Sequence, residues 1–314
     1  MKANSNLALV FPGQGSQHVG MGKDFYDNYA SSRAVFQQAE GRLDFSLSRL
    51  CFEGPEEKLK ETANAQPAIV AVSLAVLEGL KESGFLEKLS APAFTAGHSL
   101  GEYAALAASG ALNISDAIYL ARRRGELMAQ AAQSNPGAMA AIIGLEEKEL
   151  CDICSTTGAG IANYNCPGQL VISGSEQSID EAIRLATEKG ARRAVPLAVS
   201  GAFHTPLMRS AAVGLAGVIE ELSFKNPVVP IVGNTTACPL SSATEIIKEL
   251  IDQLTGSVRW QESVEYMIGK GITTFLEIGP GKVLSGLIKR INRDVTLYNV
   301  EDSQTLTALE NKLG

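Results

Sequence analysis

The chain has 314 residues, of which 45% are hydrophobic and 19% are charged, a balance typical of a soluble globular protein. This length can form one large α/β domain, or a large domain that carries a smaller inserted one. The net charge of −7 argues against nucleic acid as a partner because no basic surface dominates. The net charge does not exclude an anionic small molecule as a substrate, because binding of a small molecule depends on the charge of the site alone.

Targeting, disulfide and metal signals are weak in this sequence. No apolar run is long enough to span a membrane, and Met1–Asn6 has no signal-peptide core, which predicts a cytoplasmic protein without a membrane partner. The five cysteines are scattered and odd in number, so no disulfide framework is expected. Cys151 and Cys154 fall within a helical run and are interpreted as ordinary helix residues. Three histidines without paired spacing predict no metal site, and no cofactor is expected.

Strands and helices alternate along most of the chain, which predicts a parallel sheet covered on both faces. Apolar runs predict strands at 7–11, 95–97, 228–232, 273–278 and 295–300. Helices are expected at about 23–60, 66–80, 102–108, 117–132, 207–222, 244–254, 261–269, 282–291 and 304–313. Pro67 is expected in the first turn of its helix, and Ser115 with Asp116 at the cap of the helix from 117.

The middle of the chain has a different pattern. Strands are predicted at 138–143, 160–164, 169–173 and 193–197, with helices at 146–155 and 177–189. This βαββαβ order is that of the ferredoxin-like fold. The sequence therefore predicts a small subdomain at 134–198, inserted into a large α/β catalytic domain formed by 1–133 and 199–314.

The segment 97–101 has the sequence Gly-His-Ser-Leu-Gly and joins a predicted strand to a predicted helix. In that context a Gly-x-Ser-x-Gly pattern presents its serine on a sharp turn beside a helix N-terminus, where backbone N–H groups favour negative charge. Acyl transfer needs this environment because an oxyanion forms next to the nucleophile. Ser99 is therefore the candidate nucleophile, although the pattern also arises by chance in glycine-rich chains.

Arg124 projects from the apolar stripe of the helix predicted at 117–132. An arginine in a core-facing position is unfavourable unless its charge is paired. The partner is either a buried carboxylate of the protein or the carboxylate of a substrate, which guanidinium binds in a two-pronged fork. The residues alone leave both explanations open.

A serine nucleophile needs a base, and this chain has only three histidines. His98 adjoins Ser99 and is expected to project away from it. His18 could approach the site from the loop before it, but no other feature of the sequence indicates that it is the base. His204 lies in a loop late in the chain, after the nucleophile, as in α/β-hydrolase-type enzymes. No aspartate between Ser99 and His204 is placed to complete a triad, so the sequence indicates a Ser–His pair without a carboxylate.

Several motifs together resemble the malonyl-CoA:acyl carrier protein transacylases, an acyltransferase family, over essentially the whole chain. The matching segments occur in the order and at the spacing of that family, at 11–17, 97–103, 124–125, 165 with 167–169, and 201–204. The resemblance implies an α/β-hydrolase-like core with a ferredoxin-like insertion. It makes Ser99 the nucleophile and His204 the base that later acts as an acid.

The resemblance assigns further roles. The backbone N–H groups of Gln14 and Leu100 would form the oxyanion hole, and the main-chain carbonyl of Gln253 would orient the histidine. Arg124 would bind the free carboxylate of a malonyl group. Gln66 and Phe203 would line the pocket. Cys166 departs from the family, which usually has a residue such as serine there, and is expected to be a small packed residue without a function.

The implied activity is transfer of malonyl from malonyl-CoA to the phosphopantetheine thiol of holo acyl carrier protein, for fatty acid biosynthesis. It would proceed by ping-pong kinetics through a malonyl-serine, in a monomer without a cofactor. An acyltransferase that loads a polyketide synthase shares every motif, and a serine esterase or thioesterase shares the serine turn. A non-catalytic binding module is more distant. The basic residues considered for carrier docking are Arg192, Arg193, Lys282, Lys289, Arg290 and Arg293.

Overall fold

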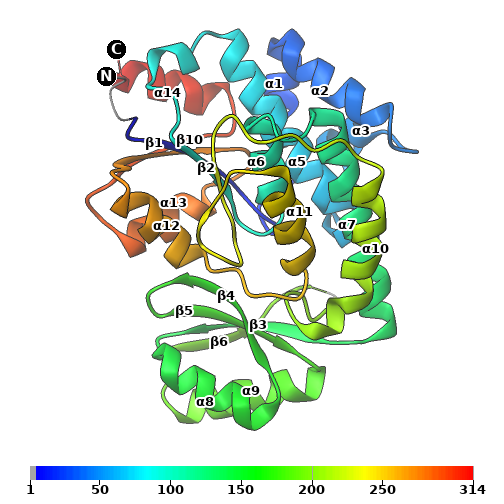
Figure 1. The fold of residues 1–314 in the computed structure, drawn as a ribbon, viewed down its shortest axis with the longest axis vertical. Helices are drawn as coiled ribbons and strands as arrows, with labels where there is room; N and C mark the ends of the chain where they lie inside the picture. The colour runs from blue at the N-terminus through cyan, green and yellow to red at the C-terminus, as the bar shows by residue number, and fades with distance from the viewer. Residues whose placement is uncertain (1–4, 200, 314) are drawn as a thin grey trace.

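The structure is a computed structural model that describes residues 5–199 and 201–313, and it contains two lobes (Figure 1). The large lobe is built on a six-stranded sheet with the order β10-β9-β1-β2-β7-β8. Its strands are β1 (Leu7–Phe11), β2 (Phe94–Gly97), β7 (Ile231–Val232), β8 (Pro239–Leu240), β9 (Thr274–Ile278) and β10 (Thr296–Val300). Neighbouring strands are parallel except β8, which runs antiparallel to β7. The sequence predicted the parallel sheet but missed β8 and overestimated the length of β7.

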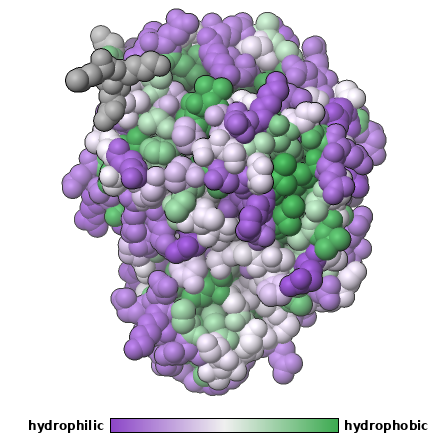
Figure 2. Space-filling view, in the orientation of Figure 1, coloured by the Kyte–Doolittle hydropathy of each residue, from purple (hydrophilic) through white to green (hydrophobic). Residues whose placement is uncertain are grey.

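Alternate residues of the central strand β1 enter two separate cores. Leu7, Leu9 and Phe11 pack into the larger core, while Ala8 and Val10 face the other side of the sheet. The helices of this lobe are α1 (Lys23–Asn28), α2 (Ala30–Glu40), α3 (Leu47–Glu53), α4 (Glu56–Lys60), α5 (Thr62–Glu82), α6 (Gly101–Ala108), α7 (Ile114–Ser134), α10 (Arg209–Glu220), α11 (Ala243–Asp252), α12 (Trp260–Gly269), α13 (Val283–Ile291) and α14 (Ser303–Leu313). The prediction of a sheet covered on both faces is confirmed. Hydrophilic residues are spread over the face shown in Figure 2, with neutral and hydrophobic areas between them.

Helix α5 corrects two expectations. It begins at Thr62, so Pro67 lies inside the helix rather than in its first turn. Pro67 has no N–H to donate to Ala63, and the Arg122 guanidinium donates to the Ala63 carbonyl oxygen instead, at 3.0 Å. In the described part of the chain, α5 alone is long and apolar enough to cross a membrane, contrary to the expectation of no such run. Its most apolar window is 83% buried, so it is a core helix of this fold.

The cap of helix α7 differs from the prediction by a few residues. Asn113 is the N-cap, and its side chain accepts a hydrogen bond from the backbone N–H of Asp116. Asp116 is not the cap; its carboxylate accepts from Arg42 at 2.5 Å. Asparagine competes well with serine for this position because its side-chain oxygen reaches the third backbone N–H of the helix.

The small lobe is a four-stranded antiparallel sheet with the order β4-β5-β3-β6. It consists of β3 (Ala138–Ile143), α8 (Glu147–Thr157), β4 (Gly160–Cys166), β5 (Gln169–Gly174), α9 (Glu176–Glu188) and β6 (Arg193–Pro196), in the predicted sequence of elements. Both helices pack on the face away from the large lobe (Figure 1). Strand β4 also exchanges hydrogen bonds with Val258 of the large lobe, through Tyr164 and Ala162 at 2.8 Å each.

The turn between β2 and α6 depends on two glycines. A Cβ on Gly97 would lie 1.9 Å from the Gly101 carbonyl carbon, and a Cβ on Gly101 would lie 2.1 Å from the Phe11 oxygen. Between them Ser99 adopts a φ of 49°, a left-handed conformation that non-glycine residues rarely take. The absence of both side chains therefore lets the turn pack directly against the end of β1.

We predict that Gly101→Ala lowers the free energy of unfolding by about 2–3 kcal/mol, because the backbone at Phe11 has to move to admit the methyl group. Urea denaturation followed by circular dichroism measures this. Gly217→Ala is the matched control, since that helical glycine has no atom within 4 Å of an added Cβ and should gain about 0.5–1 kcal/mol. Equal effects of the two substitutions would contradict the packing argument.

Candidate active site

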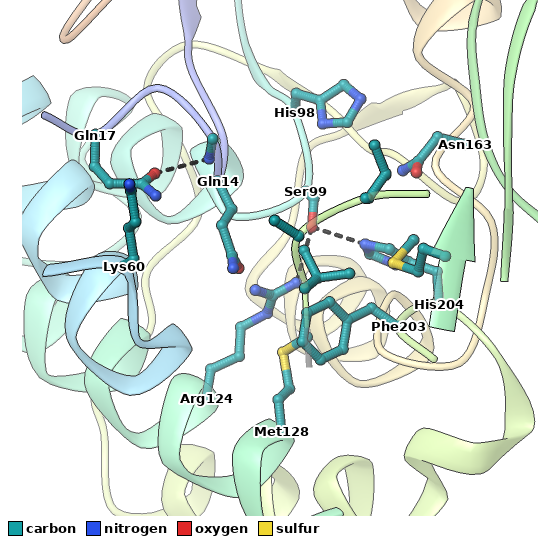
Figure 3. Close-up of a pocket in the computed structure, with 15 residues that line it drawn as sticks. Gln14, Gln17, Lys60, His98, Ser99, Arg124, Met128, Asn163, Phe203 and His204 are labelled. Carbon is teal, nitrogen blue, oxygen red and sulfur yellow. Dashed lines mark hydrogen bonds between the residues drawn. The ribbon is translucent and has the colours of Figure 1, made fainter. Parts of the chain in front are cut away.

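Ser99, His204 and Gln253 form a continuous series of hydrogen bonds. Figure 3 shows the first of these bonds, between Ser99 and His204. The Ser99 Oγ lies 2.9 Å from His204 Nε2, and His204 Nδ1 lies 2.8 Å from the main-chain oxygen of Gln253. Because a carbonyl oxygen only accepts, Nδ1 carries the proton and Nε2 is free to accept the one on Ser99. The histidine is thus oriented by a carbonyl, without the aspartate that a triad would supply.

The three hydrogen-bonded residues come from three different parts of the large lobe. Ser99 lies between β2 and α6, and His204 lies in the loop before α10, with a φ of 61°. Gln253 is the C-terminal cap of α11, where the last carbonyls of a helix lack partners within the helix. The Gln253 carbonyl is therefore available to the histidine. The structure places the three residues together as the sequence and the family resemblance predict.

The backbone around Ser99 is held by Asn234, which the sequence analysis missed. The Asn234 Oδ1 accepts from the backbone N–H of Ser99 at 2.6 Å, and its Nδ2 donates to the oxygen of Gly97 at 2.7 Å. The Asn234 N–H itself donates to a carboxylate oxygen of Glu102 at 2.7 Å. The only sequence signal was a polar residue two positions after the predicted strand that ends at Val232.

Arg124 reaches the same serine from α7 and is fully buried, with 1% of its surface exposed. Its Nη2 donates to the Ser99 Oγ at 2.9 Å and to the Gln253 Oε1 at 3.0 Å, while Nη1 donates to the Gln66 Oε1 at 2.9 Å. In the described residues no carboxylate pairs with this guanidinium, and its Nε has no partner. The structure thus removes the first of the two explanations left open, a direct pairing with a carboxylate of the protein.

The nearest carboxylate along the hydrogen-bond network is Glu102, which is one side chain away from Arg124. The Gln253 amide stands between them: its Oε1 accepts from Arg124, and its Nε2 donates to Glu102 and, at 3.1 Å, to the Ser99 oxygen. Burial raises the pKa of Glu102 well above its usual range, opposed by these donors and by the nearby guanidinium. A charged residue in the otherwise apolar run after Gly101 was the signal that could have identified it.

A cavity of about 390 Å³ opens onto the Ser99 hydroxyl. It is lined by the predicted site residues Gln14, Ser99, Arg124, Phe203 and His204, together with Gly15, Gln17, Lys60, His98, Met128, Met139, Asn163, Leu197, Ala198 and Val199. Gln66 was expected to line the pocket, and this expectation is wrong. Its side chain is buried behind Arg124, because its Oε1 accepts from that guanidinium and its Nε2 donates to the Met128 Sδ.

The loop that follows β1, residues 12–17, is rich in glycine and packs against the turn that carries Ser99. A Cβ on Gly13 would lie 2.5 Å from the His98 oxygen, so only glycine allows this approach. The next residue, Gln14, and Leu100, which precedes α6, both have backbone N–H groups that donate to no other group in the described residues. Unused N–H groups beside a nucleophile fit the requirement for stabilising an oxyanion.

The electrostatic environment keeps His204 neutral. Burial, and secondarily the Arg124 cation, lower the pKa of His204 to about 3. Burial likewise lowers the pKa of His98, whose Nε2 lies 2.8 Å from the Asn165 Oδ1 rather than near Ser99. His98 therefore points away from the nucleophile, as expected. Cys166 is buried, and no cluster of ligand residues in 5–199 and 201–313 could hold a metal.

The comparisons with known proteins agree with this site. The model of the family described as "acyl transferase domain" matches residues 8–308. The chain belongs to the acyl transferase family. It is 47% identical over 307 residues to a malonyl CoA-acyl carrier protein transacylase from Bacillus subtilis, covering 96% of this chain and 95% of the relative. A Staphylococcus aureus protein of the same name is 41% identical over 302 residues, covering 95% and 96%.

Solved structures of acyl transferase family members have the same fold. An acyl-carrier-protein S-malonyltransferase from Bartonella henselae superposes with a TM-score of 0.93 at 42% identity, covering 98% of this chain and 99% of that one. A malonyl-transacylase in complex with its type II polyketide synthase acyl carrier protein superposes with a TM-score of 0.92 at 40% identity, covering 98% and 100%. The mixed architecture of a parallel-sheet core with a separate antiparallel sheet is therefore that of malonyltransferases.

The depressed pKa of His204 predicts an unusual pH dependence for the free protein. Ser99 should react with an uncharged sulfonyl fluoride at a constant rate from pH 8 down to about 5, because the imidazole stays neutral until the pH approaches 3. Inactivation rates measured across this range, with mass spectrometry to confirm labelling at Ser99, test this. A half-maximal rate near pH 6.5, the value of an ordinary histidine, would contradict it.

The lowered pKa of His204 also affects the stability of the fold, which has to be measured as a control. The native pKa lies below that of the unfolded chain, so the unfolded state binds the extra proton first and acid favours unfolding. The stability contributed by this histidine is therefore present above about pH 6.5 and declines toward pH 3. Circular dichroism at each pH separates this loss of structure from a change in the reactivity of Ser99.

Proposed function

We propose that this protein transfers the malonyl group from malonyl-CoA to the phosphopantetheine thiol of an acyl carrier protein, and so supplies malonyl carrier for fatty acid biosynthesis. The observation that carries the proposal is Arg124, a buried cation without a carboxylate partner in the described residues, in contact with the nucleophile. The names of the relatives from Bacillus subtilis and Staphylococcus aureus support the same activity.

The proposed reaction has two half-reactions at one serine. The Ser99 Oγ attacks the thioester carbonyl while His204 Nε2 accepts its proton, and the N–H groups of Gln14 and Leu100 stabilise the oxyanion. The C–S bond then breaks, and the proton passes to the coenzyme A sulfur. In the second half, the carrier thiol gives its proton to His204 and its sulfur attacks the malonyl-serine carbonyl. The ester C–O bond then breaks, and the proton passes from His204 to the Ser99 Oγ. Two half-reactions at one serine give ping-pong kinetics.

Arg124 gives this site its selectivity for a carboxylated acyl group. One hydrogen on its Nη1 is unused after the bond to Gln66, and a carboxylate can take it while competing with Ser99 for Nη2. An acetyl group leaves the buried guanidinium unpaired, at a cost of several kcal/mol. Phe203 lines the acyl end of the cavity and would restrict a substituent on the malonyl carbon.

We also propose a domain type for each of the two lobes. We assign the large lobe, 1–133 with 199–314, to an α/β-hydrolase-like catalytic domain and the small lobe, 134–198, to a ferredoxin-like subdomain. The strand order β4-β5-β3-β6, with both helices on one face, supports the second assignment. All the proposed site residues come from one chain and none needs a cofactor, which fits a monomer. Free thiols at all five cysteines fit a reducing compartment such as the cytoplasm.

The carrier protein would dock on a basic surface near the junction of the lobes. Of the candidates from the sequence, Arg192, Arg193 and Arg290 line one small cavity with Gly168. Lys282 and Lys289 are exposed on the same helix region as Arg290. Local cations are needed because the protein as a whole is acidic and would otherwise repel an acidic carrier.

Two other functions are weaker. A polyketide-synthase acyltransferase shares the site, and one neighbour in structure is a malonyl-transacylase bound to such a carrier. Only the identity of the carrier separates it from a fatty acid enzyme. A serine esterase or thioesterase would also use Ser99 and His204. Hydrolysis of a simple ester, however, does not need a buried cation such as Arg124 to bind a carboxylate on the acyl group.

Intact-mass spectrometry after mixing with malonyl-CoA tests the proposal. The wild type should gain one malonyl group, and Ser99→Ala should gain none, because the ester forms on that oxygen. Addition of a pantetheine thiol should then discharge the acyl-enzyme much faster than water does. A mass gain that survives the substitution would exclude Ser99 as the nucleophile, and discharge to water alone would favour a hydrolase.

A further inference from the structure

The guanidinium of Arg124 and the imidazole of His204 contact the same oxygen atom. Each lies 2.9 Å from the Ser99 Oγ, so the fixed cation and the base are no more than about 6 Å apart. His204 has to become an imidazolium when it accepts the serine proton, and it would do so beside a buried positive charge. The Arg124 cation therefore opposes the transfer of the Ser99 proton to His204.

The groups around His204 do not cancel this charge. Glu102, on α6, is separated from Arg124 by the Gln253 amide, and Tyr103 places its ring 5.5 Å from the guanidinium. The other ionisable groups that face the histidine or line the cavities beside it are His98, Lys60, Cys151, Cys154 and Tyr164. Burial is the largest cause that lowers the pKa of His204 to about 3, and Arg124 is the largest charge that adds to it.

We infer that the carboxylate of the bound malonyl group acts as the counter-ion of Arg124 and thereby enables His204 to accept the proton of Ser99. The substrate thus supplies the negative charge that an aspartate supplies in a Ser-His-Asp triad. This inference rests on the proposed function, and it adds that selectivity for malonyl is expressed in the chemical step as well as in binding.

Electrostatics sets the size of the effect. Two unit charges about 6 Å apart at an effective dielectric constant of about 20 change an equilibrium by roughly 100-fold. A carboxylate on Arg124 would relieve most of this penalty on the imidazolium. It would also compete for the Nη2 hydrogen that Ser99 now accepts, leaving the oxygen free to attack. A group without a carboxylate, such as acetyl, does neither.

The atoms of the step balance without a further reactant. The Ser99 oxygen forms a bond to the thioester carbon as its proton moves to His204 Nε2, and the carboxylate stays bound to Arg124 throughout. Collapse of the intermediate breaks the C–S bond, and the same proton moves from Nε2 to the sulfur. The malonyl carboxylate then remains beside Arg124 in the acyl-enzyme, so the base is enabled again for the carrier thiol.

The test is the pH dependence of single-turnover acylation of the wild-type protein at saturating malonyl-CoA or acetyl-CoA. Rates under saturation report the histidine in the complex, not in the free enzyme. We expect the acid limb for malonyl-CoA at about pH 4–5, up to about two units above the pKa of about 3 that His204 has in the free protein, and the limb for acetyl-CoA at least one pH unit lower. The plateau for malonyl-CoA should be at least about 10-fold higher. Coincident limbs would overturn the inference.

Matched variants assign the effect to the charge. In Arg124→Gln the acid limb for acetyl-CoA should move up by at least one pH unit, because the cation is gone, whereas Arg123→Gln, which removes an arginine paired with Glu126 at the surface, should leave it in place. An unmoved limb in a folded Arg124→Gln overturns the inference. The wild-type comparison stands if that variant fails to fold. Absence of any malonyl-enzyme in the wild type would instead refute the proposed function.

Discussion

The buried, uncompensated charge of Arg124 is the constraint on which the rest of the site depends. A guanidinium with 1% exposure and no direct carboxylate partner in the described chain is kept only by a set of neutral acceptors, Gln66, Gln253 and Ser99. Two of these acceptors also have a second role. The main-chain oxygen of Gln253 bonds to His204, and Ser99 is the nucleophile that we propose. One hydrogen on the Arg124 Nη1 remains for an anion.

The strand order explains why residues so far apart in sequence meet. In the order β9-β1-β2-β7 the strands are parallel, so the loops that follow them emerge at one edge of the sheet. Gln14 follows β1, Ser99 follows β2, and Asn234 follows β7. The glycines at 97 and 101 bring the turn after β2 against the end of β1, and this close contact places the unused N–H groups beside the serine.

Periodicity and motifs predicted most of the fold, because strands, helices and a strand–turn–serine pattern are local features. They also singled out Ser99 and His204, which the structure brings together. They failed where the deciding partner is distant. Asn234 and Glu102 are ordinary residues in the sequence, and only the tertiary structure shows that they hold the serine turn. The prediction that Gln66 lines the cavity was wrong because its side chain contacts Arg124 instead. Pro67 is tolerated inside α5 because Arg122 satisfies the carbonyl that it leaves free.

Selection of the acyl group by its carboxylate is the role that we propose for Arg124. The most direct measurement is a competition between malonyl-CoA and acetyl-CoA for acylation of Ser99, in the wild type and in Arg124→Ala, with both acyl-enzymes quantified by intact mass. The account predicts that the substitution lowers malonylation by at least about 100-fold, the loss expected when a buried charge pair is removed, while acetylation is retained or increased. Equal losses for both acyl groups would contradict it.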